Sequence, residues 1–272
     1  ASRQWREASL LRRLGLITGA RLLDEGVFSG WSYIVMELVD GDPFPGILPD
    51  EDEARMEVKC ARARALLSEL ARLHAAGIVH ADLKPNNALI ERESGRLVLL
   101  DFGLSRILGD DLTGKKARRE GTPIYMSPEQ LRAQRALPAS DLYAVGVILF
   151  ELFAGHTPQD ASSVTALMRE RLMQPAPSLA EHAPDTPEVF IALVDALLER
   201  EPGMRPKSAE HALAIAREDR TAATMRHPVQ ALLDLDEVLE HLGARESLDL
   251  GGIIGADGER IVRAIRARWE AR

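Results

Sequence analysis

The chain has 272 residues, and its hydrophobic share of 46% and charged share of 28% are typical of a globular protein with a buried core. A net charge of −8 and an isoelectric point near 5.5 disfavour nucleic acid as a partner, and the single cysteine, Cys60, excludes an internal disulfide. The longest apolar run, residues 142–153, is shorter than the roughly 20 residues of a membrane-spanning helix, so a cytoplasmic protein without a membrane segment is expected.

The first elements expected along the chain are one helix and two strands. Residues 4–14 have apolar side chains at helical spacing, which predicts a helix. Residues 20–23 and 33–38 are strand-like, with a turn between them that contains Gly26 and Gly30. A connector without regular structure is expected next, because it is rich in residues that interrupt helices and strands: Pro43, Pro45, Gly46 and Pro49.

Most of the remaining chain is expected to be helical. A helix over residues 53–76 carries leucines on one face and ends at Gly77. Short strands are predicted at residues 78–79, 88–90 and 97–100. Further helices are predicted over residues 139–154, 163–173, 187–200 and 208–217.

Two short motifs place reactive side chains in loops beside predicted strands. Residues 80–87 read His-Ala-Asp-Leu-Lys-Pro-Asn-Asn, and residues 101–103 read Asp-Phe-Gly. Together they supply two carboxylates, an amide and an ammonium group. Phosphoryl transfer needs such a set: oxygen ligands for magnesium, a carboxylate beside the attacking hydroxyl and a cation for the moving phosphate.

A third motif, residues 121–129, reads Gly-Thr-Pro-Ile-Tyr-Met-Ser-Pro-Glu. With it, the chain from about Arg6 to Ala216 resembles the eukaryotic-type protein kinase family, in the serine/threonine branch that also occurs in bacteria. The resemblance implies an α+β protein kinase-like fold and transfer of the ATP γ-phosphoryl group to Ser or Thr hydroxyls of protein substrates. It implies a truncated N-lobe, a mostly helical C-lobe and a tail or further region, at residues 1–42, 43–217 and 218–272.

The resemblance also implies a role for each motif residue. Asp82 would orient the substrate hydroxyl and accept its proton, and Lys84 would neutralise charge on the transferred group. Asn87 and Asp101 would hold Mg²⁺. Thr122 would contact the catalytic loop and, with Lys84, favours Ser/Thr over Tyr substrates.

An ATP site is implied further upstream. Residues 33–39 resemble the strand that enters the hinge, with Met36 as gatekeeper. The backbone of Glu37 and Val39 would then hydrogen-bond adenine, and Leu89 would form the floor of the pocket. The pattern alone is also compatible with a simple core strand.

Other positions are expected to be structural. Glu129 should pair with Arg205 as a buried ion pair. Asp141 resembles the family residue that bonds the catalytic-loop backbone, and it also suits the acidic preference of a helix N-terminus. Residue 81 is alanine where many members have arginine, which predicts that activation depends little on loop phosphorylation.

The start of the chain departs from the family pattern. Glu7 resembles the helix glutamate that pairs with the ATP-binding lysine, but neither that lysine nor a glycine-rich loop is present. Weak or absent activity is therefore expected for this chain alone. A pseudokinase or scaffold and, with less support, a small-molecule phosphotransferase of the aminoglycoside type stay open as alternatives, and so do the substrate and the oligomeric state.

Overall fold

The computed structural model describes residues 20–28, 31–102, 105–107, 122–159 and 163–225. The chain divides into two units, residues 1–222 and 223–272, and the second falls almost wholly outside the described residues. The helix predicted over residues 4–14 also lies outside them. No helix in the described ranges is long and apolar enough to cross a membrane.

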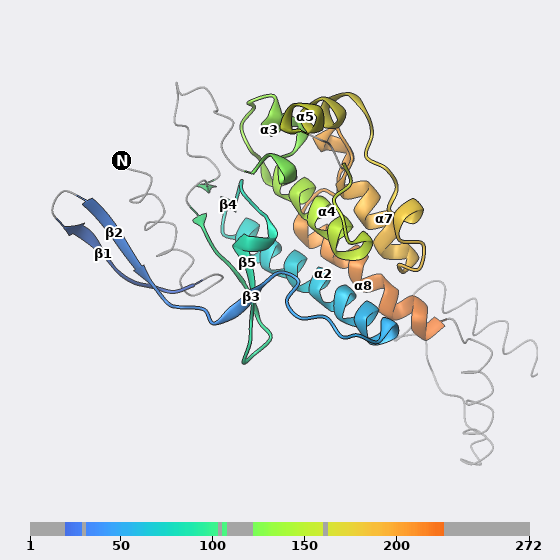
Figure 1. The fold of residues 1–272 in the computed structure, drawn as a ribbon, viewed down its shortest axis with the longest axis horizontal. Coiled ribbons are helices and arrows are strands. Elements are labelled where there is room, and N and C mark those ends of the chain that lie inside the picture. The colour runs from blue at the N-terminus through green and yellow to red at the C-terminus, as the bar shows by residue number, and fades with distance from the viewer. Residues whose placement is uncertain (1–19, 29–30, 103–104, 108–121, 160–162, 226–272) are drawn as a thin grey trace, which may run out of the picture. The chain divides into compact units, whose positions relative to one another are not determined.

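Strands β1 (Leu22–Phe28) and β2 (Trp31–Met36) form an antiparallel hairpin (Figure 1). Two strands were predicted here, but the turn was placed too early, because Gly26 lies inside β1 opposite Tyr33. A Cβ atom at Gly26 would come within 2.7–2.9 Å of the Tyr33 ring. Glycine here leaves room for the Tyr33 side chain, which a Cβ atom would displace, and it does not mark a turn.

The connector predicted to lack regular structure contains a short strand. β3 (Gly41–Pro43) pairs antiparallel with β5 (Ala88–Glu91), which pairs in turn with β6 (Leu97–Leu99). The prediction was wrong at Pro43, which is compatible with β3 because this strand lies at the edge of the sheet. A second pair joins β4 (Ile78–Val79) to β7 (Arg106–Ile107).

Helices build the rest of the described chain (Figure 1). The predicted helices are present, although their ends shift by a few residues, and α8 runs eight residues beyond the predicted end at residue 217. The bounds are α2 Asp52–Ala75, α3 Pro128–Leu131, α4 Pro138–Ala154, α5 Val164–Met173, α6 Leu179–His182, α7 Glu188–Leu197 and α8 Ala209–Met225. Single 3₁₀ turns occupy Pro85–Asn87, Pro123–Tyr125 and Pro202–Met204.

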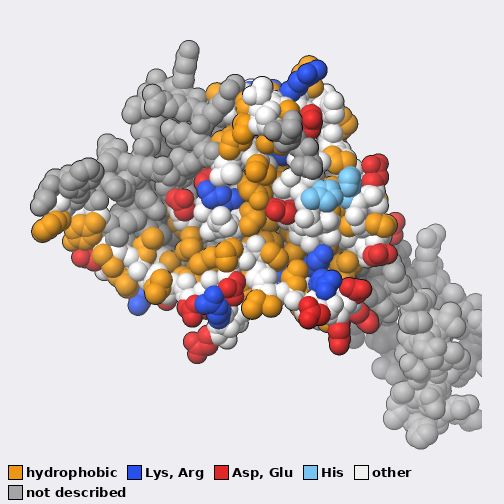
Figure 2. All heavy atoms as spheres, viewed as in Figure 1, with side chains coloured by type: hydrophobic (Ala, Val, Ile, Leu, Met, Phe, Trp, Pro, Cys, Tyr) orange, Lys and Arg blue, Asp and Glu red, His pale blue; other side chains and the backbone are white. Residues whose placement is uncertain are grey.

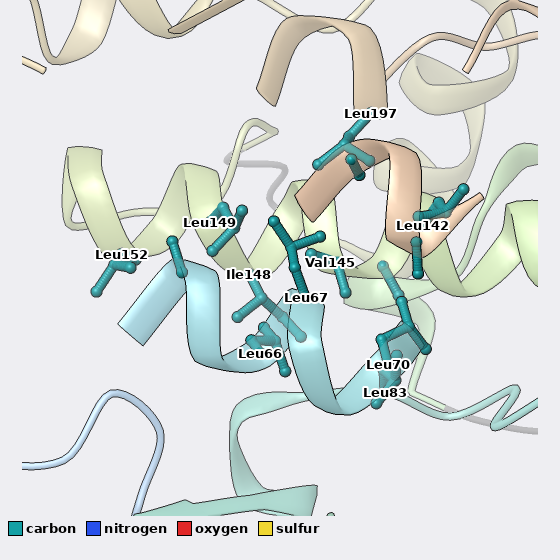
Figure 3. Packing of buried hydrophobic residues seen from close by; sticks show 14 of the residues in the cluster. Leu66, Leu67, Leu70, Leu83, Leu142, Val145, Ile148, Leu149, Leu152 and Leu197 are labelled. Atoms are coloured by element: carbon teal, nitrogen blue, oxygen red, sulfur yellow. The ribbon is translucent and has the colours of Figure 1, made fainter. Parts of the chain in front are cut away.

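Helix α4 is at the centre of the core. It is apolar on nearly all sides and is buried over most of its length, as expected for a helix that is surrounded by protein. Leucines of α2 pack against it, as Figure 3 shows for Leu66, Leu67 and Leu70. Helix α2 ends as predicted, because Gly77 has a φ of 75° and donates its N–H to the His74 carbonyl.

Helices α4 and α7 approach each other closely at Gly146. A Cβ atom there would lie 2.9 Å from the Leu197 Cβ and 3.2 Å from the Leu197 carbonyl carbon. A Gly146→Ala variant is therefore expected to lose about 1–3 kcal/mol of stability, despite the better helix propensity of alanine. Urea unfolding measures this, with Gly203→Ala as a control because its Cβ meets open space. Equal stability of the two variants would contradict the close packing.

Charges of both signs are spread over the face shown in Figure 2, with hydrophobic side chains between them. No continuous patch of Lys and Arg is visible among the described residues on this face.

Candidate active site

The loop that follows β4 is tied to helix α4 through its backbone, and α2 contacts the same carboxylate. The Asp141 carboxylate, in the first turn of α4, accepts hydrogen bonds from the N–H groups of His80 and Ala81, each at 2.8 Å. His74 Nε2 of α2 lies 2.9 Å from the same carboxylate. Because Asp141 is itself buried, these contacts hold the loop in a fixed position on the helical core.

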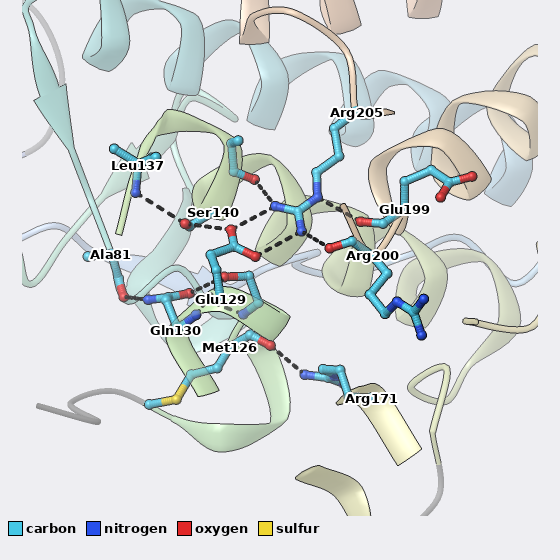
Figure 4. A network of polar contacts seen from close by, with 12 residues as sticks. Ala81, Met126, Glu129, Gln130, Leu137, Ser140, Arg171, Glu199, Arg200 and Arg205 are labelled. Carbon is cyan, nitrogen blue, oxygen red and sulfur yellow. Dashed lines mark hydrogen bonds and ion pairs between the residues drawn. The ribbon is translucent and has the colours of Figure 1, made fainter. Parts of the chain in front are cut away.

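The backbone of Ala81 is held at both of its polar groups. Its N–H donates to Asp141, and its carbonyl accepts a hydrogen bond from Gln130 Nε2 of α3 at 2.9 Å (Figure 4). The residue has a φ of 68°, which is unfavourable for alanine and is maintained only where surrounding contacts enforce it. The loop therefore gains its shape here from backbone contacts, at the position where the family pattern has an arginine side chain.

The Asp82 carboxylate accepts hydrogen bonds from its own loop and from a segment 40 residues later in the chain. Its Oδ2 accepts from Lys84 Nζ at 2.9 Å, and its Oδ1 accepts from the Thr122 N–H at 3.0 Å. Lys84 Nζ also lies 3.2 Å from Thr122 Oγ1, so the three residues form a closed set of contacts. The Asp82 and Lys84 side chains are only 8% and 22% exposed, which strengthens their electrostatic interaction.

The two predicted metal ligands, Asn87 and Asp101, lie on neighbouring segments. Asn87 follows the loop and donates its Nδ2 to the Asp82 carbonyl at 2.9 Å. The Leu100 N–H donates to the Asn87 carbonyl at 2.8 Å, which places the residue before Asp101 beside Asn87. Asp101 has a φ of 57°, and the next residue, Phe102, is buried.

His80 is packed behind the loop. Its ring packs against Phe102 in a tilted arrangement, 5.2 Å between centroids, and its Nε2 lies 3.0 Å from the Leu100 carbonyl. Its Nδ1 accepts from the Asp82 N–H at 3.4 Å, which fits the neutral tautomer with hydrogen on Nε2. Burial lowers the pKa of His80, against the opposing pull of nearby carboxylates such as Asp141.

The domain is expected to lose stability on mild acidification because of His80. The unfolded chain takes up a proton near the ordinary pKa of 6.5, whereas folded His80 does so only at lower pH. The contribution of neutral His80 to the free energy of unfolding is therefore fully present above about pH 6.5. Below this pH the free energy of unfolding decreases by up to about 1.4 kcal/mol per pH unit. Urea unfolding at several pH values should show a shallower dependence for His80→Asn, and equal slopes would contradict this.

The residues predicted to contact adenine lie on two segments. Strand β2 ends at Met36, and residues 37–40 continue without regular structure into β3. The Glu37 N–H donates to the Arg21 carbonyl at 2.8 Å. Val39 lies two residues before β3. Leu89 lies on β5 and is half-buried, on the strand face opposite its buried neighbours at residues 88 and 90.

A buried ion pair supports the segment that contains Thr122. Arg205 Nη1 and Nη2 lie 2.8 and 2.9 Å from the two carboxylate oxygens of Glu129, as Figure 4 shows. Ser140 adds a hydrogen bond to Glu129 at 2.7 Å. Burial raises the pKa of Glu129, but the hydrogen bonds and charge of Arg205 outweigh it and lower the pKa below its ordinary value.

Comparison with known protein families matches residues 2–215 to the protein kinase domain. This match covers well over half of the chain and includes every loop residue described above. The chain belongs to the protein kinase domain family. The predicted family and the predicted α+β fold are thereby confirmed.

The chain is also similar to curated bacterial kinases. Serine/threonine-protein kinase PknL of Mycobacterium tuberculosis is 34% identical over 199 residues, which are 73% of this chain and 50% of PknL. Probable serine/threonine-protein kinase PknB of Lactococcus lactis is 33% identical over 185 residues, 68% of this chain and 29% of that protein. Serine/threonine-protein kinase pkn3 of Myxococcus xanthus is 34% identical over 215 residues, 75% of this chain and 39% of pkn3. The chain thus spans half or less of each relative.

The structure of this kinase domain adds residues that the sequence analysis missed. Gln130 forms a capping box with Ser127 at the start of α3, and the spacing Ser-x-x-Gln is a signal that was available in the sequence. Arg171 is buried on α5, and a single arginine in a helical pattern gives no such signal. Glu7 lies outside the described residues, so its predicted role as a lysine partner stays a prediction.

Proposed function

We propose that the protein transfers the γ-phosphoryl group of ATP to Ser or Thr hydroxyls of protein substrates. The observation that carries this proposal is the contact set of Asp82, Lys84 and Thr122, in which a shielded carboxylate and an ammonium group share one threonine. Thr122 belongs to a segment 40 residues after Asp82 along the chain. Such an arrangement can present a hydroxyl to a carboxylate while a cation offsets the charge of the phosphate.

In this proposal each of the three side chains has a distinct task. Asp82 orients the substrate hydroxyl and accepts its proton as the new oxygen–phosphorus bond forms and the bond from phosphorus to the departing ADP breaks. Lys84, held beside it at 2.9 Å, neutralises charge on the oxygens of the transferred group. Thr122 fixes the positions of both through its N–H and its hydroxyl.

Asn87 and Asp101 are the proposed ligands of Mg²⁺. The Asn87 amide uses its nitrogen in the bond to the Asp82 carbonyl, which leaves its oxygen as the group that can ligate a cation. An amide oxygen and a carboxylate suit Mg²⁺, which usually takes few protein ligands and completes its shell with phosphate and water. When bound, Mg²⁺ would neutralise charge on the phosphates of ATP.

We assign adenine recognition to Met36, Glu37, Val39 and Leu89. Because the Glu37 N–H is committed to Arg21, the Glu37 carbonyl is the group left to accept from adenine. The Val39 N–H would supply the complementary donor. Leu89 would offer apolar surface to the ring from the β5 side.

Mg-ATP binding is expected to depend on Asp101. At a ligand concentration of 100 times Kd, binding stabilises a protein by about 2.7 kcal/mol, which a thermal shift assay detects. The shift should require Mg²⁺, disappear in Asp101→Asn and persist in Asp185→Asn, whose carboxylate is exposed. A full shift in Asp101→Asn, or one that is independent of Mg²⁺, would overturn the assignment. The assay should use the whole polypeptide from the gene, with the 272-residue chain beside it.

A further inference from the structure

Arg171 on α5 is a buried cation whose side chain contacts are unusual. The residue is only 1% exposed. Its Nε and Nη2 lie 3.2 and 2.7 Å from Gln159 Oε1, and none of its hydrogen-bond partners among the described residues is a carboxylate. Burying a charge is unfavourable unless hydrogen bonds compensate for it, so the contacts of this guanidinium must be held in place by the fold.

The remaining nitrogen of Arg171 binds backbone carbonyls of one short segment. Nη1 lies 2.6 Å from the Ile124 carbonyl, 2.9 Å from the Met126 carbonyl and 3.3 Å from the Pro123 carbonyl. Figure 4 shows Arg171 pointing at Met126. One side chain of α5 thus holds the backbone of residues 123–126, a task that suits the planar, multidentate guanidinium of arginine better than lysine.

The held segment is attached to the candidate active site at both ends. Thr122 precedes it and contacts Asp82 and Lys84. Ser127 follows it and caps α3, whose Gln130 bonds the carbonyl at residue 81 in the loop. Between these ends, the Ile124 side chain is 41% exposed and available to a bound peptide.

We propose that Arg171 is a positioning residue for the protein substrate. By binding the carbonyls of this segment, Arg171 holds the backbone at Ile124 in a fixed position beside the site of transfer. A bound substrate chain would then lie against a surface of defined shape, with its hydroxyl directed at Asp82. This inference rests on the proposed kinase function, and it assigns a role to a residue that would touch neither ATP nor the peptide.

Kinetics and hydrogen exchange together test this role. In Arg171→Lys the KM for a peptide substrate should rise at least about tenfold, because hydrogen bonds to a charged group are lost. Peptide-independent ATP hydrolysis and the KM for ATP should stay within about twofold of wild type, which a general loss of folding would not allow. Amide exchange at residues 124–127 should accelerate at least about tenfold, while exchange in α4 stays unchanged.

Two further variants sharpen the test. Arg169→Lys lies on the same helix with an exposed side chain, and it should match wild type in every measurement. Gln159→Asn keeps the charge of Arg171, but its shorter side chain moves the oxygen that accepts from Arg171 away from the guanidinium. This variant should therefore also raise the peptide KM, by about threefold.

Each result decides a separate point. Unchanged exchange at residues 124–127 in Arg171→Lys and Gln159→Asn would overturn the inference, and so would equal losses of peptide phosphorylation and ATP hydrolysis. If wild type hydrolyses ATP but phosphorylates no protein or peptide, the proposed function fails and the substrate role fails with it. In that case accelerated exchange in the variant would still show that Arg171 holds the segment.

Discussion

Replacing Asp82 with asparagine is expected to lower kcat for phosphoryl transfer by about 10²–10⁴-fold. Asparagine has nearly the same shape and can still accept from the Thr122 N–H, which now lies 3.0 Å from the carboxylate. It lacks the basicity needed to take the hydroxyl proton and the charge that holds Lys84. The loss should therefore appear in kcat and not in the affinity for Mg-ATP.

The measurement is steady-state phosphorylation of a protein substrate, with Mg-ATP binding followed separately by thermal shift. Asp185→Asn serves as the control because its carboxylate is exposed. An Asp82→Asn enzyme that keeps more than about a tenth of the wild-type kcat would show that this carboxylate is not the proton acceptor. Loss of Mg-ATP binding in the same variant would point to a wider defect of the loop.

Replacing Glu129 with glutamine is expected to destabilise the domain by about 3–5 kcal/mol. The change leaves the Arg205 guanidinium buried without its carboxylate, since the other hydrogen-bond partners of Arg205 among the described residues are backbone carbonyls. For a domain of about 200 residues, the midpoint of thermal unfolding should fall by roughly 6–20 °C. Glu201→Gln is the matched control, because its pair with Arg200 is exposed and 4.0 Å apart, and such pairs contribute about 0–1 kcal/mol.

A double-mutant cycle separates the pair from its surroundings. Glu129→Gln combined with Arg205→Met should lose less stability than the sum of the single variants, because neither charge is then left alone. Since the pKa of Glu129 is lowered in the folded state, its contribution is present above about pH 4.5 and is lost as the pH falls. Additive single effects, or equal acid sensitivity of wild type and Glu129→Gln, would contradict a coupled pair.

Much of the fold could be predicted because its signals are local. Helix α2 has its leucines on one face and a glycine at its end. The sequence of α4 is apolar on nearly all sides, which predicts a buried helix. The motifs at residues 80–87, 101–103 and 121–129 identified the family, because their order and spacing carry more information than any single residue.

The errors arose where residues outside a segment decide its structure. Gly26 was assigned to a turn, but the Tyr33 ring on the partner strand explains it. Pro43 was taken to exclude a strand, yet β5 supplies a partner 45 or more residues away and leaves Pro43 at an edge. In the candidate site, Arg171 escaped notice because three of its four hydrogen-bond partners among the described residues are backbone carbonyls, which no sequence pattern reveals.

The most direct test of kinase function is to follow the γ-phosphoryl group itself. The whole polypeptide would be incubated with Mg²⁺, γ-labelled ATP, an acceptor protein and an aminoglycoside, and the products analysed by mass spectrometry. The proposed function predicts label on Ser or Thr of protein, none on the aminoglycoside, and almost none with Asp82→Asn. Label on the aminoglycoside alone, or no transfer by a wild-type protein that binds Mg-ATP, would contradict a protein serine/threonine kinase.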